Sequence, residues 1–125
     1  MKGDAMLHHE LLRNEGILLI RPEGPLHAGD FESVASVVDP YIEANGKLRG
    51  VMIEARSFPG WESIAALVSH VRFVRDHHRL IAKLAAVSDD AVLSVVPHIA
   101  KHFVNAEVRH FKTADREDAL AWLRG

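Results

Sequence analysis

Short apolar runs alternate with longer stretches of helical periodicity along this chain. Residues 7–13 and 17–20 are two such runs, and Asn14-Glu15-Gly16 between them is a turn sequence. The pair predicts an opening β-hairpin. Pro22 and Pro25 should end it, because proline cannot donate a hydrogen bond to a sheet.

The first helix is expected to begin between His27 and Asp30. Apolar residues then recur at spacings of three and four, a stripe that can face a sheet: Phe31, Val34, Ala35, Val38 and Ile42. Pro40 lies inside this pattern and predicts a kink or a separate last turn. Asn45-Gly46 should stop the helix, because both residues tolerate a left-handed C-cap.

Residues 50–54 are apolar enough for a central strand that is buried on both faces. The longest helix is predicted over residues 61–79, and residues 81–87 follow as a fourth strand. One apolar stripe runs along that helix at helical spacing: Ile64, Leu67, Val68, Val71 and Val74.

Residues 89–103 have helical spacing that Pro97 interrupts, which predicts a kinked helix or two short helices. Residues 107–111 should form an edge strand, and residues 115–124 a closing helix. The order β-β-α-β-α-β-α-β-α indicates an α/β fold with a mixed, largely parallel five-stranded sheet covered by helices. No linker or repeat interrupts residues 1–125, so we expect a single domain.

Composition excludes several classes of function. The chain has no cysteine, which excludes disulfides and thiol chemistry. The net charge of −2 argues against nucleic acid as a partner. No apolar run is long enough for an integral membrane segment, and no signal sequence is evident, so a cytoplasmic location is the simplest expectation.

Motifs of catalysis and cofactor binding are missing as well. The sequence contains no Gly-x-Ser-x-Gly elbow, Walker loop or dinucleotide-binding glycine pattern, so we expect neither an enzyme nor a cofactor. His98 and His102 are four residues apart, a spacing that could suit zinc on a helix. No third ligand is evident near them, and we expect surface histidines and no metal site.

Five segments together resemble a known family: Asp39-Pro40-Tyr41-Ile42, Gly46-Lys47-Leu48-Arg49-Gly50, Gly60-Trp61-Glu62-Ser63, Phe73-Val74-Arg75-Asp76-His77-His78 and Ala106-Glu107-Val108-Arg109-His110-Phe111. With the element order, they resemble the STAS fold of bacterial anti-anti-sigma factors. The closer resemblance is to the SpoIIAA-like group, which is akin to CRAL-TRIO lipid-binding domains. It covers nearly the whole chain and implies the fold more strongly than the function.

Anti-anti-sigma proteins of the STAS fold carry a phosphorylatable serine at the start of the helix after the third strand. The resemblance therefore makes Ser57 and Ser63 candidate phosphorylation sites. The acidic-serine-glycine motif of those proteins is missing at this junction, and Ser63 is expected one turn into the helix. A phosphorylation switch is therefore the weakest of the functional hypotheses.

The junction between the third strand and the long helix is the most informative stretch. A helix start at the end of a strand can hold an anion, and aromatic side chains there can cover an apolar ligand or a partner. The candidate binding residues at the junction are Ser57, Phe58, Gly60 and Trp61. The alternative is that the two aromatic residues only cap the core.

The long helix adds Arg72, Phe73 and Arg75 to the candidate binding residues. One hypothesis is a non-catalytic regulatory or interaction module that binds a protein partner or forms a homodimer. The other is a binder of a small apolar or anionic ligand, such as a lipid or nucleotide, in a helix–sheet cleft near Phe58, Trp61 and Phe73. A solvated helix face is the alternative for the two arginines.

Overall fold

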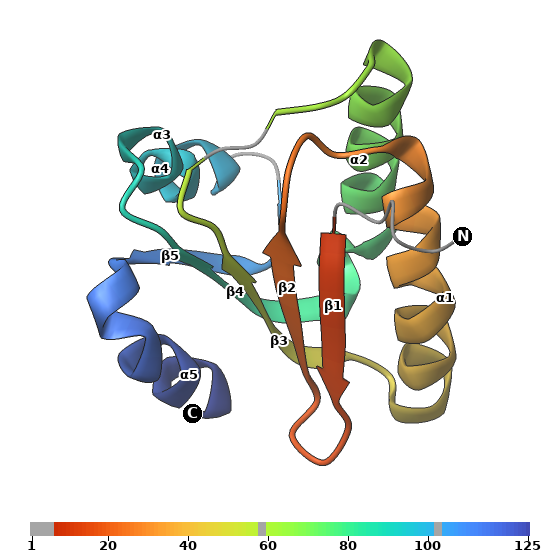
Figure 1. The fold of residues 1–125 in the computed structure, drawn as a ribbon. Helices are drawn as coiled ribbons and strands as arrows, with labels where there is room; N and C mark the ends of the chain where they lie inside the picture. Colours follow the sequence, from red (N-terminus) through yellow and green to blue (C-terminus); the bar gives the residue numbers. More distant parts are fainter. Residues whose placement is uncertain (1–6, 58–59, 102–103) are drawn as a thin grey trace.

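The computed structural model describes residues 7–57, 60–101 and 104–125, and it contains one five-stranded sheet (Figure 1). The strands lie in chain order across the sheet. β1 is antiparallel to β2, and all other neighbouring pairs are parallel. Their bounds are β1 Leu7–Leu12, β2 Ile17–Pro22, β3 Leu48–Glu54, β4 Ile81–Val87 and β5 Glu107–Phe111. The predicted fold class is confirmed, and β5 is an edge strand as expected.

Helices cover both faces of this sheet. α1 and α2 lie side by side on one face, and α5 packs on the other (Figure 1). α3 and α4 are short and lie near β5. Of the two predicted alternatives, the two short helices are confirmed, but the break falls at Val95 and Pro97 lies in the first turn of α4. The bounds are α1 Ala28–Asn45, α2 Ile64–His77, α3 Ala91–Ser94, α4 Val96–Ala100 and α5 Arg116–Arg124, with single 3-10 turns at His78–Leu80 and Thr113–Asp115.

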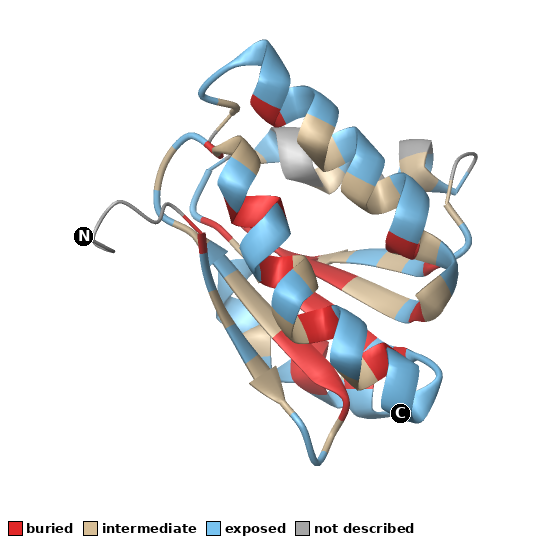
Figure 2. Cartoon of the chain, turned by 90° about the vertical axis from the view of Figure 1, so that its right-hand side faces the viewer, coloured by how far each residue is buried: buried red, intermediate tan, exposed pale blue. Residues whose placement is uncertain are grey.

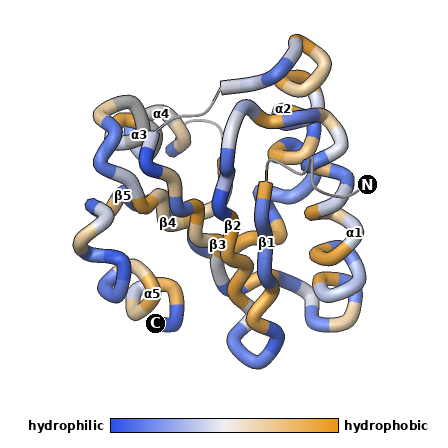
Figure 3. Tube along the Cα trace, in the orientation of Figure 1, coloured by the Kyte–Doolittle hydropathy of each residue, from blue (hydrophilic) through white to orange (hydrophobic). Residues whose placement is uncertain are grey.

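The strand register places one apolar row across the sheet on the α1–α2 side. Leu18 pairs with Val51, Val51 with Leu84, and Leu84 with Val108. Alternate residues along a strand point to opposite faces, so these four side chains project together toward the two helices. Orange, hydrophobic segments are accordingly prominent in the central strands β2, β3 and β4 of the trace in Figure 3.

The opposite face of the sheet packs tightly against α5. Ile17, Met52 and Ala85 form a buried cluster there with Leu120 and Leu123 of the helix. Gly50 makes the close approach possible. A Cβ built on Gly50 would lie 2.7 Å from Leu123 Cδ2, which is closer than van der Waals contact allows.

α1 continues as one helix through Pro40 to Asn45, so the prediction of a separate last turn is wrong. Its buried side chains include Phe31, Val34, Val38 and Ile42, as the stripe predicts. Packing of that stripe on the sheet stabilises the helix and outweighs the hydrogen bond that proline removes. Gly46 ends the helix with φ 92°, which confirms the predicted stop.

α2 differs from the prediction in its start and in the face it buries. The helix begins at Ile64, and Ser63 is its N-cap, whose hydroxyl oxygen accepts a hydrogen bond from Ala66 N at 3.1 Å. The residues from Trp61 to Ser63 therefore precede the helix. Ile64 and Val71 of the apolar stripe are 80% and 61% exposed, and most of the helix surface is solvent-accessible (Figure 2).

The face of α2 that meets the sheet carries Ala66, His70, Phe73 and His77 at spacings of four, three and four. Ala66 and His77 are its buried residues. No helix in the described part of the chain is long and apolar enough to cross a membrane.

The contact between Gly50 and Leu123 predicts that Gly50→Ala destabilises the protein. The added methyl group overpacks the α5 side of the sheet and should lower the free energy of unfolding by about 1–3 kcal/mol in urea titrations. Gly29→Ala in the first turn of α1 is the matched control, because nothing lies within 4 Å of its Cβ position. Equal stability of the two variants would contradict the tight packing of α5.

Candidate functional site

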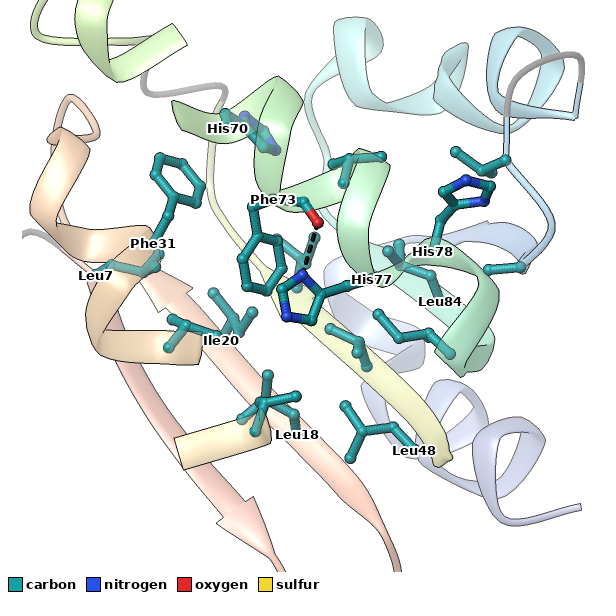
Figure 4. Close-up of a pocket in the computed structure, with 18 of the residues that line it drawn as sticks. Leu7, Leu18, Ile20, Phe31, Leu48, His70, Phe73, His77, His78 and Leu84 are labelled. Carbon is teal, nitrogen blue, oxygen red and sulfur yellow. Dashed lines mark hydrogen bonds between the residues drawn. The ribbon is translucent and has the colours of Figure 1, made fainter. Parts of the chain in front are cut away.

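A cavity of about 200 Å³ lies between the sheet and the α1–α2 pair (Figure 4). The apolar row of the sheet forms its floor, with Leu18, Val51, Leu84 and Val108 all among the lining residues. Phe31 of α1 and Phe73 of α2 form part of the helical wall, with ring centroids 6.1 Å apart. The remaining apolar lining residues are Leu7, Ile20, Pro22, Leu26, Val34, Val38, Leu48, Ile53, Ala55, Val74, Ile81, Val104 and Ala106.

Histidines are the only polar side chains that line this cavity in the part of the chain described. His70 and His77 come from α2, and His78 from the 3-10 turn that follows it. All three therefore enter the cavity wall from one continuous segment of the chain, opposite an apolar sheet. Their hydrogen bonds determine what this wall can offer a ligand.

Hydrogen bonding fixes the tautomer of His70. Trp61 Nε1–H donates to His70 Nδ1 at 3.0 Å, and an indole nitrogen can only donate. Nδ1 is therefore unprotonated, and the ring proton is on Nε2. Burial lowers the pKa of His70 from its ordinary value of 6.5, which favours the same neutral form. The ring also stacks on Phe31, with ring centroids 4.8 Å apart.

His77 connects α1 to α2. Its Nδ1 lies 2.8 Å from the Phe73 carbonyl oxygen, and its Nε2 lies 2.7 Å from Asp39 Oδ1. Both partners accept hydrogen bonds, so the ring donates to both only when both nitrogens are protonated. The ring also stacks on Phe73 with centroids 4.0 Å apart, and Figure 4 shows the two rings side by side at the cavity.

His78 is held on its outer side by the backbone. Asn105 N–H donates to His78 Nδ1 at 2.9 Å, which again leaves the ring proton on Nε2. His77 and His78 are adjacent and point to different partners, as expected for a neighbouring pair. The cavity wall thus contains two histidines whose Nδ1 atoms accept a hydrogen bond, His70 and His78, and one that binds Asp39.

The predicted junction residues lie around the cavity in different ways. Phe73 lines it directly, whereas Trp61 lies behind His70 and packs partly buried against the core. Gly60 O accepts from Leu26 N at 2.9 Å, and Trp61 forms an isolated bridge with Leu26. Gly60 has φ 75°, a conformation that glycine adopts without strain. Phe58 lies outside the described residues.

The serine candidates lie away from the apolar cavity. Ser57 is exposed and borders a second, polar hollow with Arg21, Glu54 and Arg56. Glu54 in that hollow is 2.9 Å from Arg116 and 3.8 Å from Arg21. Ser63 caps α2 and is exposed.

The cationic residues of α2 face solvent. Arg72 and Arg75 are exposed and do not line the cavity, and Arg75 Nε is 3.0 Å from Asp76 Oδ1. His98 is exposed on α4, and His102 lies outside the described residues. Within the described ranges, no three His, Asp or Glu side chains gather closely enough to hold a metal ion.

Sequence reasoning missed His70 and His77 as site residues. The signal was present, because Ala66, His70, Phe73 and His77 recur at helical spacing on one face of the helix. The more hydrophobic stripe that begins at Ile64 obscured it. A stripe of histidine and phenylalanine facing a sheet becomes recognisable only when the other stripe is known to face solvent.

The family model that matches this chain is SpoIIAA-like, and it covers residues 17–124. The chain belongs to the SpoIIAA-like family. A similar solved structure is an uncharacterized protein of the DUF3478 family with a SpoIIAA-like fold, from Shewanella loihica PV-4. It is 18% identical with a TM-score of 0.69, over 94% of this chain and 91% of the other. That likeness shows the shared fold. The search of curated proteins found no match.

The lowered pKa of His70 predicts how this SpoIIAA-like protein responds to acid. The unfolded chain protonates His70 near the ordinary value of 6.5, whereas the folded chain does so only at lower pH. The stabilising contribution is therefore complete above 6.5 and is lost as the pH falls through the folded-state pKa.

Urea titrations of the wild type and His70→Phe at about pH 8 and about pH 5 measure this effect. The wild type should lose stability relative to the variant as the pH falls. A stability difference that stays constant between the two pH values would contradict a buried, neutral His70.

Proposed function

We propose that this protein is a non-catalytic cytoplasmic module that acts by binding, and that its ligand is a small apolar molecule held in the cavity between the sheet and α1–α2. The observation that carries the proposal is the cavity itself, with an apolar floor on the sheet and aromatic rings from both helices. Pockets of this kind, apolar with a few polar groups, are typical ligand sites.

The size of the cavity limits the ligand. An apolar cavity of about 150 Å³ in another protein takes up benzene, so a volume of about 200 Å³ suits a somewhat larger molecule. A ligand on the order of ten non-hydrogen atoms follows from that comparison. An extended lipid chain would need α1 and α2 to separate further.

The burial of the lining residues supports binding in a preformed site. Val34, Val38, Leu18 and Val51 are each at most 3% exposed, so the floor and the α1 wall are set by close packing. The α2 wall is less buried, with intermediate exposure at His70 and Phe73. A ligand would therefore enter most easily by displacement of α2.

Filling the cavity from its floor tests this function. Ala106 lines the cavity and is 8% exposed, so Ala106→Leu extends an apolar side chain into the empty volume. The variant should lose binding of butylbenzene, measured by NMR titration, and should be more stable by up to about 1 kcal/mol. Ala44→Leu, at an exposed position of α1, is the control. Equal binding by both variants would place the ligand elsewhere.

A second candidate function is self-association through α2. Four residues form an exposed apolar surface on its outer side: Ile64, Leu67, Val68 and Val71. A two-fold axis between Leu67 and Val68 would bring Ile64 of one copy against Val71 of the other. The same arrangement brings Glu62, just before α2, toward Arg72 of the second copy. Apolar and charged groups are thus both complementary in an antiparallel α2 pair.

Val71→Asp tests the dimer because it places a charge in the proposed contact, against Ile64 of the other copy, where Val71 is 61% exposed in the single chain. Sedimentation over a range of concentrations should give a dimer for the wild type and a monomer for Val71→Asp. Val95→Asp is the control, because Val95 is also exposed, at 47%, but lies between α3 and α4. A monomeric wild type, or a dimeric Val71→Asp variant, would contradict the α2 interface.

A further inference from the structure

The polar side chains of the cavity wall indicate which class of apolar ligand the cavity binds, which rests on the proposed ligand-binding function. In the part of the chain described, the polar side chains that line the cavity are His70, His77 and His78. A histidine ring can donate or accept a hydrogen bond, so the residue types alone do not show whether the wall offers a ligand donors or acceptors. The hydrogen bonds that the rings make outside the cavity decide this.

His70 and His78 are both restricted to the Nε2–H tautomer. The indole N–H of Trp61 donates to Nδ1 of His70, and the backbone N–H of Asn105 donates to Nδ1 of His78. Protonation of either Nδ1 would break its hydrogen bond. Each ring therefore keeps one polar atom for other partners, and that atom is a donor.

Neither Nε2–H has an acceptor among the described residues. No side-chain nitrogen in those residues is both fully buried and unpaired, so each Nε2 remains accessible to a molecule of the size of water. His77 is engaged at both nitrogens, by Phe73 and Asp39. The wall thus offers hydrogen-bond donors, and its side chains offer no free acceptor.

We propose that the cavity selects an apolar molecule that carries an uncharged carbonyl oxygen, such as a ketone or ester, and that Nε2–H of His70 donates to that oxygen. An amine or another donor-only group would find no acceptor side chain on the wall. A carboxylate would lose its hydration among apolar side chains without a free cation, because Asp39 already pairs with His77. A neutral carbonyl satisfies the His70 donor without either cost.

A matched pair of ligands isolates the role of the oxygen atom. Methyl hexyl ketone is compared with the alkene in which a methylene group replaces its oxygen, so that shape is nearly constant. Binding is measured by NMR titration for the wild type, His70→Phe and His70→Gln. His70→Phe keeps an aromatic ring against Phe31 and removes the donor, whereas His70→Gln restores an N–H donor. His98→Phe, at an exposed position of α4, is the control.

His70→Phe should weaken binding of the ketone about tenfold and change binding of the alkene by less than about twofold. His70→Gln should recover part of the ketone affinity, and His98→Phe should leave both ligands unaffected. In the wild type, the ketone should shift the Nε2 resonance of His70 more than the alkene does. A purely structural role of His70 would not produce that difference.

Equal losses of ketone and alkene affinity in His70→Phe would overturn the inference. Binding of the alkene by the wild type would still support the proposed apolar-ligand function. Octanoate binding more tightly than the ketone would also overturn it, because the site would then prefer an anion. Failure of both neutral ligands to bind the wild type would refute the proposed function itself, and the inference with it.

Discussion

The orientation of α2 about its own axis is the constraint on which the rest of this structure depends. An amphipathic helix normally buries its most hydrophobic stripe, but α2 exposes Ile64, Leu67, Val68 and Val71. It presents His70, Phe73 and His77 to the sheet in their place. A helix that met the sheet through its aliphatic stripe would leave no histidine in the wall and would require Phe73 to move out of the core.

Three contacts hold α2 in this orientation. His70 stacks on Phe31 of α1 and accepts the Trp61 N–H, while His77 binds Asp39 of α1. Among the described residues, the contact between His77 and Asp39 is the only polar link between the two helices. α2 is thus tied to α1 and to the junction before it by its histidines, and the sheet beneath it stays free to form the floor of a cavity. On the opposite face, Gly50 lets α5 close onto the sheet without such a space.

Most of the fold could be predicted from the sequence, because each strand and α1 has one dominant pattern. Residues 50–54 lie in β3 as predicted, with Gly50, Val51 and Met52 buried. Gly46 ends α1 with a positive φ, as the Asn-Gly pair predicts. α2 has two competing stripes, and local periodicity cannot decide which faces the sheet. The sequence pattern predicts too early a start for α2, because Trp61 pairs with Leu26, a contact between segments far apart in the sequence. Of the predicted site residues that the structure describes, Phe73 is the one that lines the cavity.

α2 leaves an apolar cavity over the sheet, and a crystal of the protein under xenon pressure tests for that cavity most directly. Xenon occupies apolar cavities of this size class without needing any polar contact. The structure predicts a xenon atom between Leu18 of β2, Phe31 of α1 and Phe73 of α2. A crystal in which the side chains of Ile64 and Val71 fill this space, with no xenon bound and His70 turned to solvent, would contradict it.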